Sequence, residues 1–343
     1  MDVGIVGGSG YGGAELLRLL AGHPVAKVSI VAARRAAGQT VGEVFPNLIG
    51  SAVSEKVLAV SDAEELTSCD VVFLATPHGA SAELAPPLVE AGVKVVDLSG
   101  AFRTDAETFS TWYGDAHPAA HLAPAVYGLP ELHADAISQA DLVANPGCYP
   151  TAALLALGPI AGLIDPKRIV VSGVSGSSGA GKGLRDDLHG SHAHGNLVAY
   201  GAPHHRHTPE IEQQLARLAD VPAVPISFTP HLAPMARGMV VTAVADLAHG
   251  VAAADVDAAF AAAYDHEPFV HVLGGGTWPA TTYVLGGNAA HVGVAVDARA
   301  ARVIVGAAID NLVKGAAGEA IQNANLMCGL EHHAGLPVEG VYP

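Results

Sequence analysis

Short apolar strands alternate with helices over the first 147 residues, and this alternation constrains the fold more than any other feature of the sequence. Strands that are largely apolar and alternate with helices are typical of a parallel sheet covered on both faces. We therefore expect an α/β fold with a doubly wound parallel (Rossmann) sheet in an N-terminal domain of residues 1–147. The predicted strands are residues 2–6, 28–32, 71–75 and 93–97, and the predicted helices are residues 14–20, 62–66 and 80–91.

The pattern changes after residue 147, where strands follow one another with fewer helices between them. This change predicts an α+β domain with a mixed or antiparallel sheet over residues 148–314. Residues 307–330 are predicted to form one long helix, with a break at Gly315 and Gly318 as the alternative, and a C-terminal helix of about residues 315–343 is expected to pack back onto the first domain. The predicted strands are residues 169–174, 223–229, 239–245, 280–285 and 291–296.

Composition excludes several classes of protein. Half of the 343 residues are hydrophobic, which is not compatible with a disordered or fibrous chain. The longest uncharged apolar stretch, residues 152–164, is too short to span a bilayer. A formal net charge of −16 argues against nucleic acid as a partner, and three widely spaced cysteines form no disulfide framework. We expect a cytoplasmic protein that binds neither nucleic acid nor membrane. If its substrate is anionic, local arginines and helix termini must overcome the net negative charge.

The glycines Gly7, Gly10 and Gly13 lie between the first predicted strand and the first predicted helix. In this context they predict a dinucleotide loop, because glycine lets the backbone approach a pyrophosphate at a helix N-terminus. A tight strand–helix turn is the alternative. The second strand leads into Arg34 and Arg35 and lacks the acidic residue that binds the ribose of NAD. Two arginines suit a 2′-phosphate, which favours NADP; an exposed loop tip is the alternative for this pair.

The segment of residues 145–151 places Cys148 in a turn constrained by Pro146 and Gly147, directly before the apolar run 152–157. That run predicts a helix. A thiol at a helix N-terminus is exposed to the positive end of the helix dipole, which favours the nucleophilic thiolate. The dense turn residues indicate a cysteine that faces a ligand, although a buried structural cysteine beside a helix is the alternative.

Two histidines, His205 and His207, precede Thr208-Pro209-Glu210, which is a typical helix start. A histidine held by such a turn can exchange a proton with a reacting group, although a surface histidine beside a helix cap would have the same sequence pattern. Residues 189–194 form a second histidine cluster. Neither cluster includes a cysteine or a complete tetrahedral ligand set, so we expect no metal.

Two arginines are candidates for binding an anionic substrate. Arg103 lies just past the end of a predicted strand, where α/β sheets bind ligands, and Arg237 lies between two predicted strands. Either guanidinium could bind a carboxylate or a phosphate through paired hydrogen bonds. A solvated loop arginine is the alternative in each case.

Residues 176–183 nearly match a P-loop, but Gly183 stands where a serine or threonine would bind magnesium. The N-terminal glycine loop also provides a nucleotide site in a better context. We therefore reject an ATP site here. A Gly/Ser-rich loop could still bind phosphate or line a nicotinamide pocket through its backbone N–H groups.

Together these motifs resemble the N-acetyl-gamma-glutamyl-phosphate reductase family of arginine biosynthesis, which is related to aspartate-semialdehyde dehydrogenase. The resemblance covers essentially the whole chain, and the segments around the cysteine and around residues 205–210 are its most specific parts. The motifs that carry it are residues 7–16, 73–79, 97–103, 127–132, 146–151, 175–181 and 205–210.

The resemblance implies that residues 148–314 form the catalytic and oligomerisation domain, and it implies roles for individual residues. Cys148 would be the nucleophile and His205 or His207 the acid/base, with Glu210 orienting one of them. The substrate would be bound by Arg103, Arg237 and Tyr200, although the histidine-rich stretch 186–203 departs from the family pattern and leaves the alignment of Tyr200 open. The residues implied in NADP binding are Gly7, Ser9, Gly10, Tyr11, Gly12, Gly13, Arg34, Arg35, Pro77, Ser178, Gly179, Gly181 and Asn311.

The implied reaction is an NADPH-dependent reduction of N-acetyl-L-glutamyl 5-phosphate to the 5-semialdehyde and phosphate through a cysteine thioester, in a homodimer or homotetramer. Covalent catalysis fits a thiolate because sulfur is both a strong nucleophile and a good leaving group. Two alternatives remain at this point. One is reduction of another acyl phosphate, such as an aspartyl or a carrier-linked aminoadipyl or glutamyl phosphate. The other is a non-catalytic Rossmann protein that senses NADP.

Overall fold

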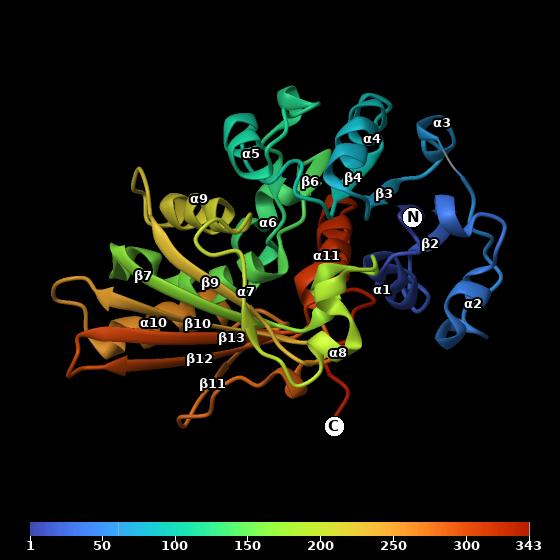
Figure 1. Cartoon of the computed structure of the whole chain (residues 1–343). Coiled ribbons are helices and arrows are strands. Elements are labelled where there is room, and N and C mark those ends of the chain that lie inside the picture. The colour runs from blue at the N-terminus through green and yellow to red at the C-terminus, as the bar shows by residue number, and fades with distance from the viewer. Residues whose placement is uncertain (61, 343) are drawn as a thin grey trace. The chain divides into compact units, whose positions relative to one another are not determined.

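The computed structural model describes residues 1–60 and 62–342. The chain divides into two compact units (Figure 1). Unit 1 contains Met1–Gly147 and Ala316–Leu336, and unit 2 contains Cys148–Gly315 and Pro337–Pro343. The chain therefore enters unit 2 at Cys148, and it first leaves that unit after Gly315.

Unit 1 is built on a six-stranded sheet in which every neighbouring pair of strands is parallel. The strand order is β2-β1-β3-β4-β6-β5, so the chain extends the sheet first on one side of β1 and then on the other. This is the doubly wound arrangement that the apolar strands predict, and the predicted fold class is confirmed. The strands are β1 (Asp2–Val6), β2 (Lys27–Ala32), β3 (Val71–Leu74), β4 (Lys94–Asp97), β5 (Val126–Tyr127) and β6 (Leu142–Ala144).

Local signals set the ends of the unit 1 helices. The side chain of Asp105 accepts a hydrogen bond from the backbone N–H of Thr108 at the start of α5, and Gly114 ends this helix with a φ of 84°. A positive φ suits glycine, which has no Cβ to clash. The helices are α1 (Tyr11–Leu20), α2 (Val41–Val44), α3 (Ala63–Leu66), α4 (His78–Glu90), α5 (Ala106–Tyr113), α6 (Pro130–Ser138) and α11 (Gly318–Met327).

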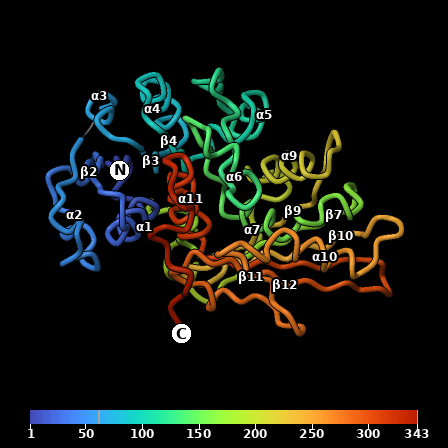
Figure 2. Tube along the Cα trace, turned by 180° about the vertical axis from the view of Figure 1, so that it is seen from behind, coloured from blue at the N-terminus to red at the C-terminus, as the bar shows by residue number. Residues whose placement is uncertain are grey.

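The last helix, α11, belongs to unit 1 although it lies near the end of the chain. It packs against α1, α6 and β4, and it lies beside α1 in both views (Figures 1 and 2). Every residue of α11 except Leu326 is buried, including several polar side chains. These are hydrogen-bonded: Asn323 Nδ2, for example, donates to the carbonyl oxygen of Gly128 at 2.8 Å and to Asn145 Oδ1 at 3.0 Å. Buried amides that are satisfied in this way fix the helix in one position.

An unbroken helix over residues 307–330 is wrong, and so is a helix over the whole of residues 315–343, whereas a break at Gly318 agrees with the start of α11. Residues 307–309 end a strand, a π-helical turn follows at Val313–Ala317, and α11 ends at Met327. The final residue of that range, Pro343, lies outside the described residues. The sequence is misleading here because alanine and glycine are frequent in both the buried strand and the helix, so neither periodicity stands out.

Unit 2 contains a seven-stranded mixed sheet with the order β11-β12-β13-β10-β7-β9-β8. The β11–β12 and β7–β9 pairs are parallel and the other pairs are antiparallel. The predicted mixed sheet is therefore confirmed. Its strands are β7 (Ile164–Ser175), β8 (Val198–Ala199), β9 (Ile226–Leu232), β10 (Met239–Leu247), β11 (Val270–Leu273), β12 (Ala290–Asp297) and β13 (Arg302–Ile309).

One face of this sheet is covered by helices. α7 (Cys148–Leu157) packs on β10, β12 and β13, and α9 (Thr208–Leu218) packs on α7. α10 (Ala253–Tyr264) packs on β11. The remaining helix of this unit, α8, is short and consists of Gly190–Ala193. Alternate residues of β10 such as Val241 and Ala243 are fully buried, whereas Thr242 between them is exposed. The period of two places one face of the sheet in the core and leaves the other accessible.

One predicted strand of unit 2 is wrong, and the prediction also omits several elements. Residues 280–285 are not a strand; they contain a 3-10 turn at Thr281–Tyr283, and their β-branched and aromatic residues explain the wrong prediction. The helix α10 and the strands β11 and β13 are absent from the prediction. Over the described residues, no helix is both long and apolar enough to cross a membrane.

Candidate active site

In unit 1, the loops that follow β1, β3 and β4 meet at the carboxyl edge of the sheet. A Cβ on Gly7, whose φ is +88°, would lie 2.2 Å from the carbonyl oxygen of Ala75, and a Cβ on Gly13 would lie 2.5 Å from the carbonyl oxygen of Gly7. Both positions require glycine because the backbones approach so closely. Gly12 is less confined, since its nearest neighbours would be Ala75 Cβ at 3.9 Å and Leu98 Cδ2 at 4.0 Å. The sequence-predicted loop therefore lies where doubly wound sheets bind ligands.

The N-terminus of α1 has the features of an anion site. Gly10 is its N-cap, no side chain caps the helix, and no acidic residue lies in its first turn. The helix dipole and the backbone N–H groups at such an end favour a negatively charged group. Tyr11 is 39% exposed at this end. The residues present therefore fit the pyrophosphate of a dinucleotide.

Other predicted cofactor residues of unit 1 surround this edge of the sheet. Arg34 and Arg35 follow β2 in a 3-10 turn, and both are exposed. Pro77 is exposed immediately before α4. The two arginines are therefore accessible to a ligand, as recognition of a 2′-phosphate would require.

Arg103, the predicted substrate-binding residue of unit 1, is largely occupied by backbone contacts. Its Nε donates to the carbonyl oxygen of Asn145 at 2.8 Å, and its Nη2 donates to that of Leu98 at 2.9 Å. Its exposed fraction is 7%. Arg103 thus connects the segments that follow β4 and β6, the second of which leads directly to Cys148.

In unit 2, Cys148 is the first residue of α7 and is partly exposed. The helix behind it contains no charged residue, and Tyr149 to Leu157 are all buried. The sequence predicts a helix close behind this cysteine, and the structure places the thiol at the helix start itself. A Cβ on Gly315 would lie 2.8 Å from Cys148 Cβ, so this glycine packs directly against the cysteine.

Tyr149, next to the cysteine, contacts both predicted histidines. Its ring centroid lies 5.9 Å from that of His205 and 6.1 Å from that of His207, and the two histidine rings are 4.9 Å apart. Phe228 contacts Tyr149 and His205 at 5.3 Å each. The Tyr149 hydroxyl donates to the carbonyl oxygen of His231 at 3.0 Å, which fixes the ring. We call Tyr149, Tyr200, His205, His207 and Phe228 the ring cluster.

Tyr200 completes the ring cluster. Its ring centroid lies 5.5 Å from that of His205, and its backbone N–H donates to the carbonyl oxygen of Pro230 at 3.0 Å. Burial raises the pKa of both Tyr149 and Tyr200, and the Cys148 sulfur adds to the shift in each case. Both phenols therefore stay protonated at neutral pH, and Tyr200 lies close enough to Cys148 to interact with it electrostatically.

Burial, together with the nearby positive charge of Arg206, lowers the pKa of His205 from 6.5 to about 4. His205 is therefore neutral at pH 7. Its Nδ1 accepts a hydrogen bond from the backbone N–H of His207 at 3.2 Å, which places the proton of the neutral ring on Nε2. His205 can therefore donate a hydrogen bond from Nε2 without carrying a positive charge.

The start of α9 holds the remaining predicted catalytic residues. His207 is its N-cap, and Thr208 N donates to the carbonyl oxygen of His205 at 2.9 Å. Glu210 lies in the first turn and is 1% exposed. The turn that proline and glutamate predict from sequence is thus present, and it fixes both histidines.

The Gly/Ser-rich loop of residues 176–181 packs against the turn that carries Arg237. Ser177 N donates to the carbonyl oxygen of Met235 at 2.9 Å, and Ser178 N donates to that of Ala236 at 3.1 Å. Asn311 joins the two segments, because its Nδ2 donates to Ser178 Oγ at 2.9 Å and its Oδ1 accepts from Gly238 N at 2.7 Å. Ser178, Asn311 and Arg237 therefore lie in one network.

Within that network, Gly179 belongs to a 3-10 turn and Gly181 ends it with a φ of +81°. Over the described residues after this turn, the next α-helix is the short α8, so the helix that a P-loop requires is missing. This agrees with the rejection of an ATP site. In residues 1–60 and 62–342 no group of three or more His, Cys, Asp or Glu side chains is arranged to hold a metal.

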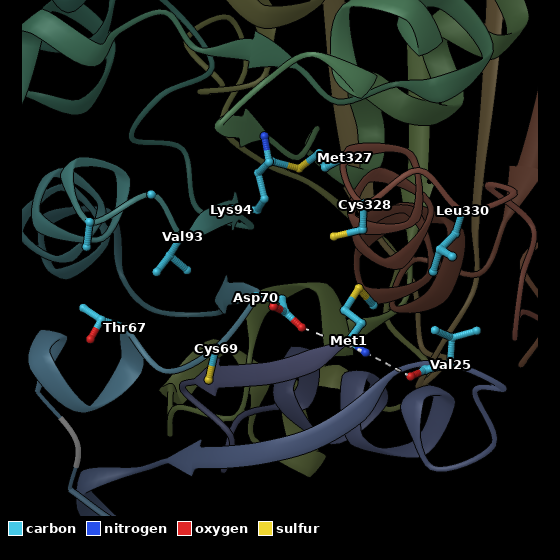
Figure 3. A pocket seen from close by; sticks show the side chains of 12 residues that line it. Met1, Val25, Thr67, Cys69, Asp70, Val93, Lys94, Met327, Cys328 and Leu330 are labelled. Carbon is cyan, nitrogen blue, oxygen red and sulfur yellow. Dashed lines mark hydrogen bonds and ion pairs between the residues drawn. The ribbon is translucent and has the colours of Figure 1, made fainter.

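A separate pocket in unit 1 lies at the opposite, amino edge of the sheet, where Asp70 precedes β3 and Lys94 begins β4 (Figure 3). Cys69 and Cys328 also line it. Burial raises the pKa of both thiols. The pocket contains none of the residues predicted for cofactor or substrate.

Sequence reasoning missed Tyr149 and Asp310 as site residues. Asp310 is fully buried and forms an ion pair with Arg237, with 3.0 Å between Asp310 Oδ2 and Arg237 Nη2. Tyr149 could have been noticed from its place beside the cysteine. Asp310 gave no local signal, because its partner lies 73 residues away in the chain.

Comparison with known proteins agrees with this geometry. The family model "Semialdehyde dehydrogenase, NAD binding domain" matches residues 2–140, and "Semialdehyde dehydrogenase, dimerisation domain" matches residues 148–311. A Micrococcus luteus protein named N-acetyl-gamma-glutamyl-phosphate reductase is 49% identical over 349 residues, which cover 99% of each chain. A Geobacter protein of the same name is 47% identical over 350 residues, which cover 100% of each.

The chain belongs to the N-acetyl-gamma-glutamyl-phosphate reductase family. The resemblance inferred from the motifs is thereby confirmed. Among solved structures, aspartate semialdehyde dehydrogenase II from Vibrio cholerae, complexed with ASA, matches with a TM-score of 0.73. The match covers 96% of this chain and 98% of that chain at 21% identity, so this reductase family member shares its fold.

Proposed function

We propose that this protein catalyses the NADPH-dependent reduction of N-acetyl-L-glutamyl 5-phosphate to N-acetyl-L-glutamate 5-semialdehyde and phosphate, in arginine biosynthesis. The observation that carries the proposal is the position of Cys148 at the start of α7, next to a tyrosine whose ring contacts both His205 and His207. A thiol at a helix start beside proton-carrying side chains is suited to acyl transfer.

In the first half of the proposed reaction, the Cys148 thiolate attacks the acyl carbon. The carbon–sulfur bond forms, the bond to the phosphate oxygen breaks, and phosphate leaves with its electron pair. Arg237, 29% exposed, is the candidate for binding a substrate anion from unit 2. Arg103 is a weaker candidate than its sequence position suggests, because its Nε and Nη2 are directed at backbone carbonyls.

The proposed cofactor is NADP. When bound, NADPH supplies the hydride that reduces the thioester. The N-terminus of α1 would hold the pyrophosphate, because Gly10 leaves this helix end without a side-chain cap. Arg34 and Arg35 would bind the 2′-phosphate, since both are exposed at the end of β2 and no acidic residue stands there.

His205 and His207 would have different roles, one as a hydrogen-bond donor and the other in proton transfer. His205 is neutral at pH 7 and protonated on Nε2, which suits it to donate a hydrogen bond to a developing oxyanion. A group with a pKa of about 4 is a poor proton donor at neutral pH. We therefore propose His207 as the residue that exchanges the proton as the aldehyde is released and the thiolate re-forms, with Glu210 in the same turn supporting its position.

The proposed activity is tested in the reverse direction, as phosphate-dependent oxidation of the semialdehyde with NADP⁺. N-acetyl-L-glutamate 5-semialdehyde should be oxidised, and aspartate semialdehyde should not. Cys148→Ser should lose turnover while NADP⁺ binding persists, and Cys328→Ser is the matched control, because Cys328 lines the separate pocket. Activity retained in Cys148→Ser would refute the covalent route.

The cofactor assignment is tested separately. Replacing Arg34 and Arg35 together with alanine should weaken NADPH binding by about 10-fold or more and leave NADH binding nearly unchanged, because only NADPH carries the 2′-phosphate. Arg299→Ala, at a side chain that is 90% exposed, is the control for the loss of surface charge. Equal losses for the two cofactors would contradict the assignment.

We further propose that the accessible face of the unit 2 sheet joins two copies of the chain. Val170, Val244, Ile304 and Ala295 stand opposite one another in register across β7, β10, β13 and β12 on this face. Val170 is 54% exposed, and an apolar row of this kind is typical of a contact surface. Light scattering should give a homodimer or homotetramer, and Val170→Lys should shift the mass toward the monomer.

A further inference from the structure

Asp310 carries a fully buried carboxylate at the end of β13, and it accepts hydrogen bonds from several directions. Its Oδ1 accepts from the backbone N–H groups of Leu312 at 2.8 Å and Val313 at 3.2 Å, and its Oδ2 accepts from Gly286 N at 2.7 Å. Arg237 Nη2 lies 3.1 Å from Oδ1 and 3.0 Å from Oδ2. Two backbone segments and one arginine are thus fixed by a single carboxylate.

The first consequence concerns Arg237. Its side chain is 29% exposed, whereas the side chain of Asp310 is 0% exposed. The ion pair therefore holds the guanidinium on its buried side and leaves part of it accessible to a ligand. A charge-assisted hydrogen bond to a buried carboxylate restricts where an arginine can point. The guanidinium is thereby oriented before any ligand binds.

The second consequence concerns Cys148. Val313 begins the π-helical turn Val313–Ala317, and its N–H donates to Asp310 Oδ1 at 3.2 Å, so the carboxylate holds the start of this turn. Gly315 N, within the turn, donates to the backbone carbonyl oxygen of Asp310 at 3.0 Å. A Cβ on Gly315 would lie 2.8 Å from Cys148 Cβ and 3.3 Å from Cys148 Cα. The turn therefore contacts the cysteine through a position where only glycine leaves enough room.

We propose that Asp310 is a positioning residue that sets the orientation of Arg237 and, through the turn that contains Gly315, the placement of the Cys148 thiol. This proposal rests on the proposed function, in which Arg237 binds the phosphoryl or carboxylate group of the substrate and Cys148 attacks it. Asp310 itself touches neither substrate nor cofactor in this role. One buried carboxylate would thus position both Arg237, which binds the anion, and Cys148, which attacks the carbon.

Asparagine is the informative replacement because it has nearly the same shape. It offers one acceptor oxygen in place of two, and its amide hydrogens would face N–H donors that Asp310 now accepts from. Either the backbone turn or Arg237 must then lose its partner. Leaving one buried donor unsatisfied typically corresponds to about a 10-fold change in an equilibrium, and an unsatisfied charged donor to about 100-fold.

The test measures two quantities in parallel. The first is the KM for inorganic phosphate in the reverse reaction. The second is the rate at which iodoacetamide alkylates Cys148, with and without inorganic phosphate as a protecting anion. In Asp310→Asn we expect the KM for phosphate to rise about 10- to 100-fold, with a smaller change in kcat, and phosphate protection of Cys148 to be lost. Asp246→Asn, which breaks a more exposed pair with Arg302, is the matched control.

Gly315→Ala tests the contact with the cysteine independently of the carboxylate, and it decides the matter if Asp310→Asn does not fold. We expect alkylation of Cys148 to change by about 10-fold or more, while binding of NADP⁺ stays unchanged. Gly162→Ala is the control, because a Cβ there would meet nothing within 4 Å. Phosphate KM, phosphate protection and Cys148 alkylation all within about 2-fold of the parent in both variants would overturn the proposal.

Failure of the proposed function gives a different result. A parent protein that does not oxidise the N-acetylated semialdehyde would refute the function, whereas the alkylation measurements need no substrate. A change in Cys148 alkylation in Asp310→Asn and Gly315→Ala would still support positioning of the thiol. Normal activity of the parent beside unchanged phosphate KM, phosphate protection and Cys148 alkylation in both variants would refute the positioning role alone.

Discussion

Replacing Gly173 with alanine should impair catalysis through the ring of Tyr149. Gly173 lies in β7, and a Cβ at this position would stand 2.4 Å from Tyr149 Cε1 and 2.6 Å from Tyr149 Cδ1. Ordinary contacts between such carbon atoms are about 3.5–4.0 Å, so the ring or the strand must move by about 1 Å. Overpacking of this kind costs about 1–3 kcal/mol of stability, because a buried ring has no empty space to enter.

The displaced ring is the one that contacts both histidines. Gly173→Ala should therefore lower kcat by more than the loss of stability alone would explain. We expect a loss of about 10-fold or more in kcat, with NADP⁺ binding unchanged, since a shift of about 1 Å in a positioned group has such an effect. The assay pairs steady-state kinetics with urea unfolding. Gly162→Ala serves again as the control with open space around the new methyl group.

A double variant separates the clash from other effects of the methyl group. Tyr149→Leu removes the ring that the methyl group would meet, so Gly173→Ala should cost much less stability in that background than in the parent. Additive losses in unfolding free energy would show that the ring of Tyr149 does not transmit the effect. The same result would refute the reasoning above.

Two further predictions concern titration and thiol reactivity. Burial lowers the pKa of His205 from 6.5 to about 4, so the unfolded chain binds a proton at this residue before the folded chain does as pH falls. The contribution of His205 to the free energy of unfolding is therefore fully present above pH 6.5 and declines toward pH 4. The decline due to this group approaches about 3 kcal/mol and should be absent in His205→Asn, as urea unfolding across this pH range would show; equal slopes in the two proteins would contradict it. Iodoacetamide should alkylate Cys148 well before Cys69 and Cys328, whose pKa values are raised by burial, and peptide mapping that finds Cys328 labelled first would contradict the assignment of the nucleophile.

Much of unit 1 is predictable from sequence because its signals are local. The glycine loop, four apolar strands and three helices depend on neighbouring residues and lie within a few residues of where the pattern predicts them. The prediction omits β5, β6, α2, α5 and α6. The existence of α7 is predictable for the same reason, since Pro146 and Gly147 set the turn before it, although the helix starts at Cys148, earlier than the predicted run. These positions depend on backbone geometry more than on distant contacts.

The errors fall where small residues or distant partners decide the structure. Strand β13 contains Gly306, Ala307 and Ala308, which fit a strand and a helix equally well, and only pairing with β10 and β12 fixes its state. Helix α10 is rich in alanine and has little amphipathic pattern to detect. In the site, Asp310 becomes recognisable only once the fold brings Arg237 to it, whereas Tyr149 stands beside the cysteine in the sequence.

The complete burial of α7 behind Cys148 has a consequence for how this protein loses activity. A helix whose residues from Tyr149 to Leu157 are all enclosed cannot fray by itself, so its amide hydrogens should exchange with deuterium only when the surrounding unit opens. The reactive sulfur is thus anchored to a region of slow exchange. Local unfolding of the exposed loops would leave the Cys148 sulfur in place. Its reactivity would be lost only when the surrounding unit unfolds cooperatively.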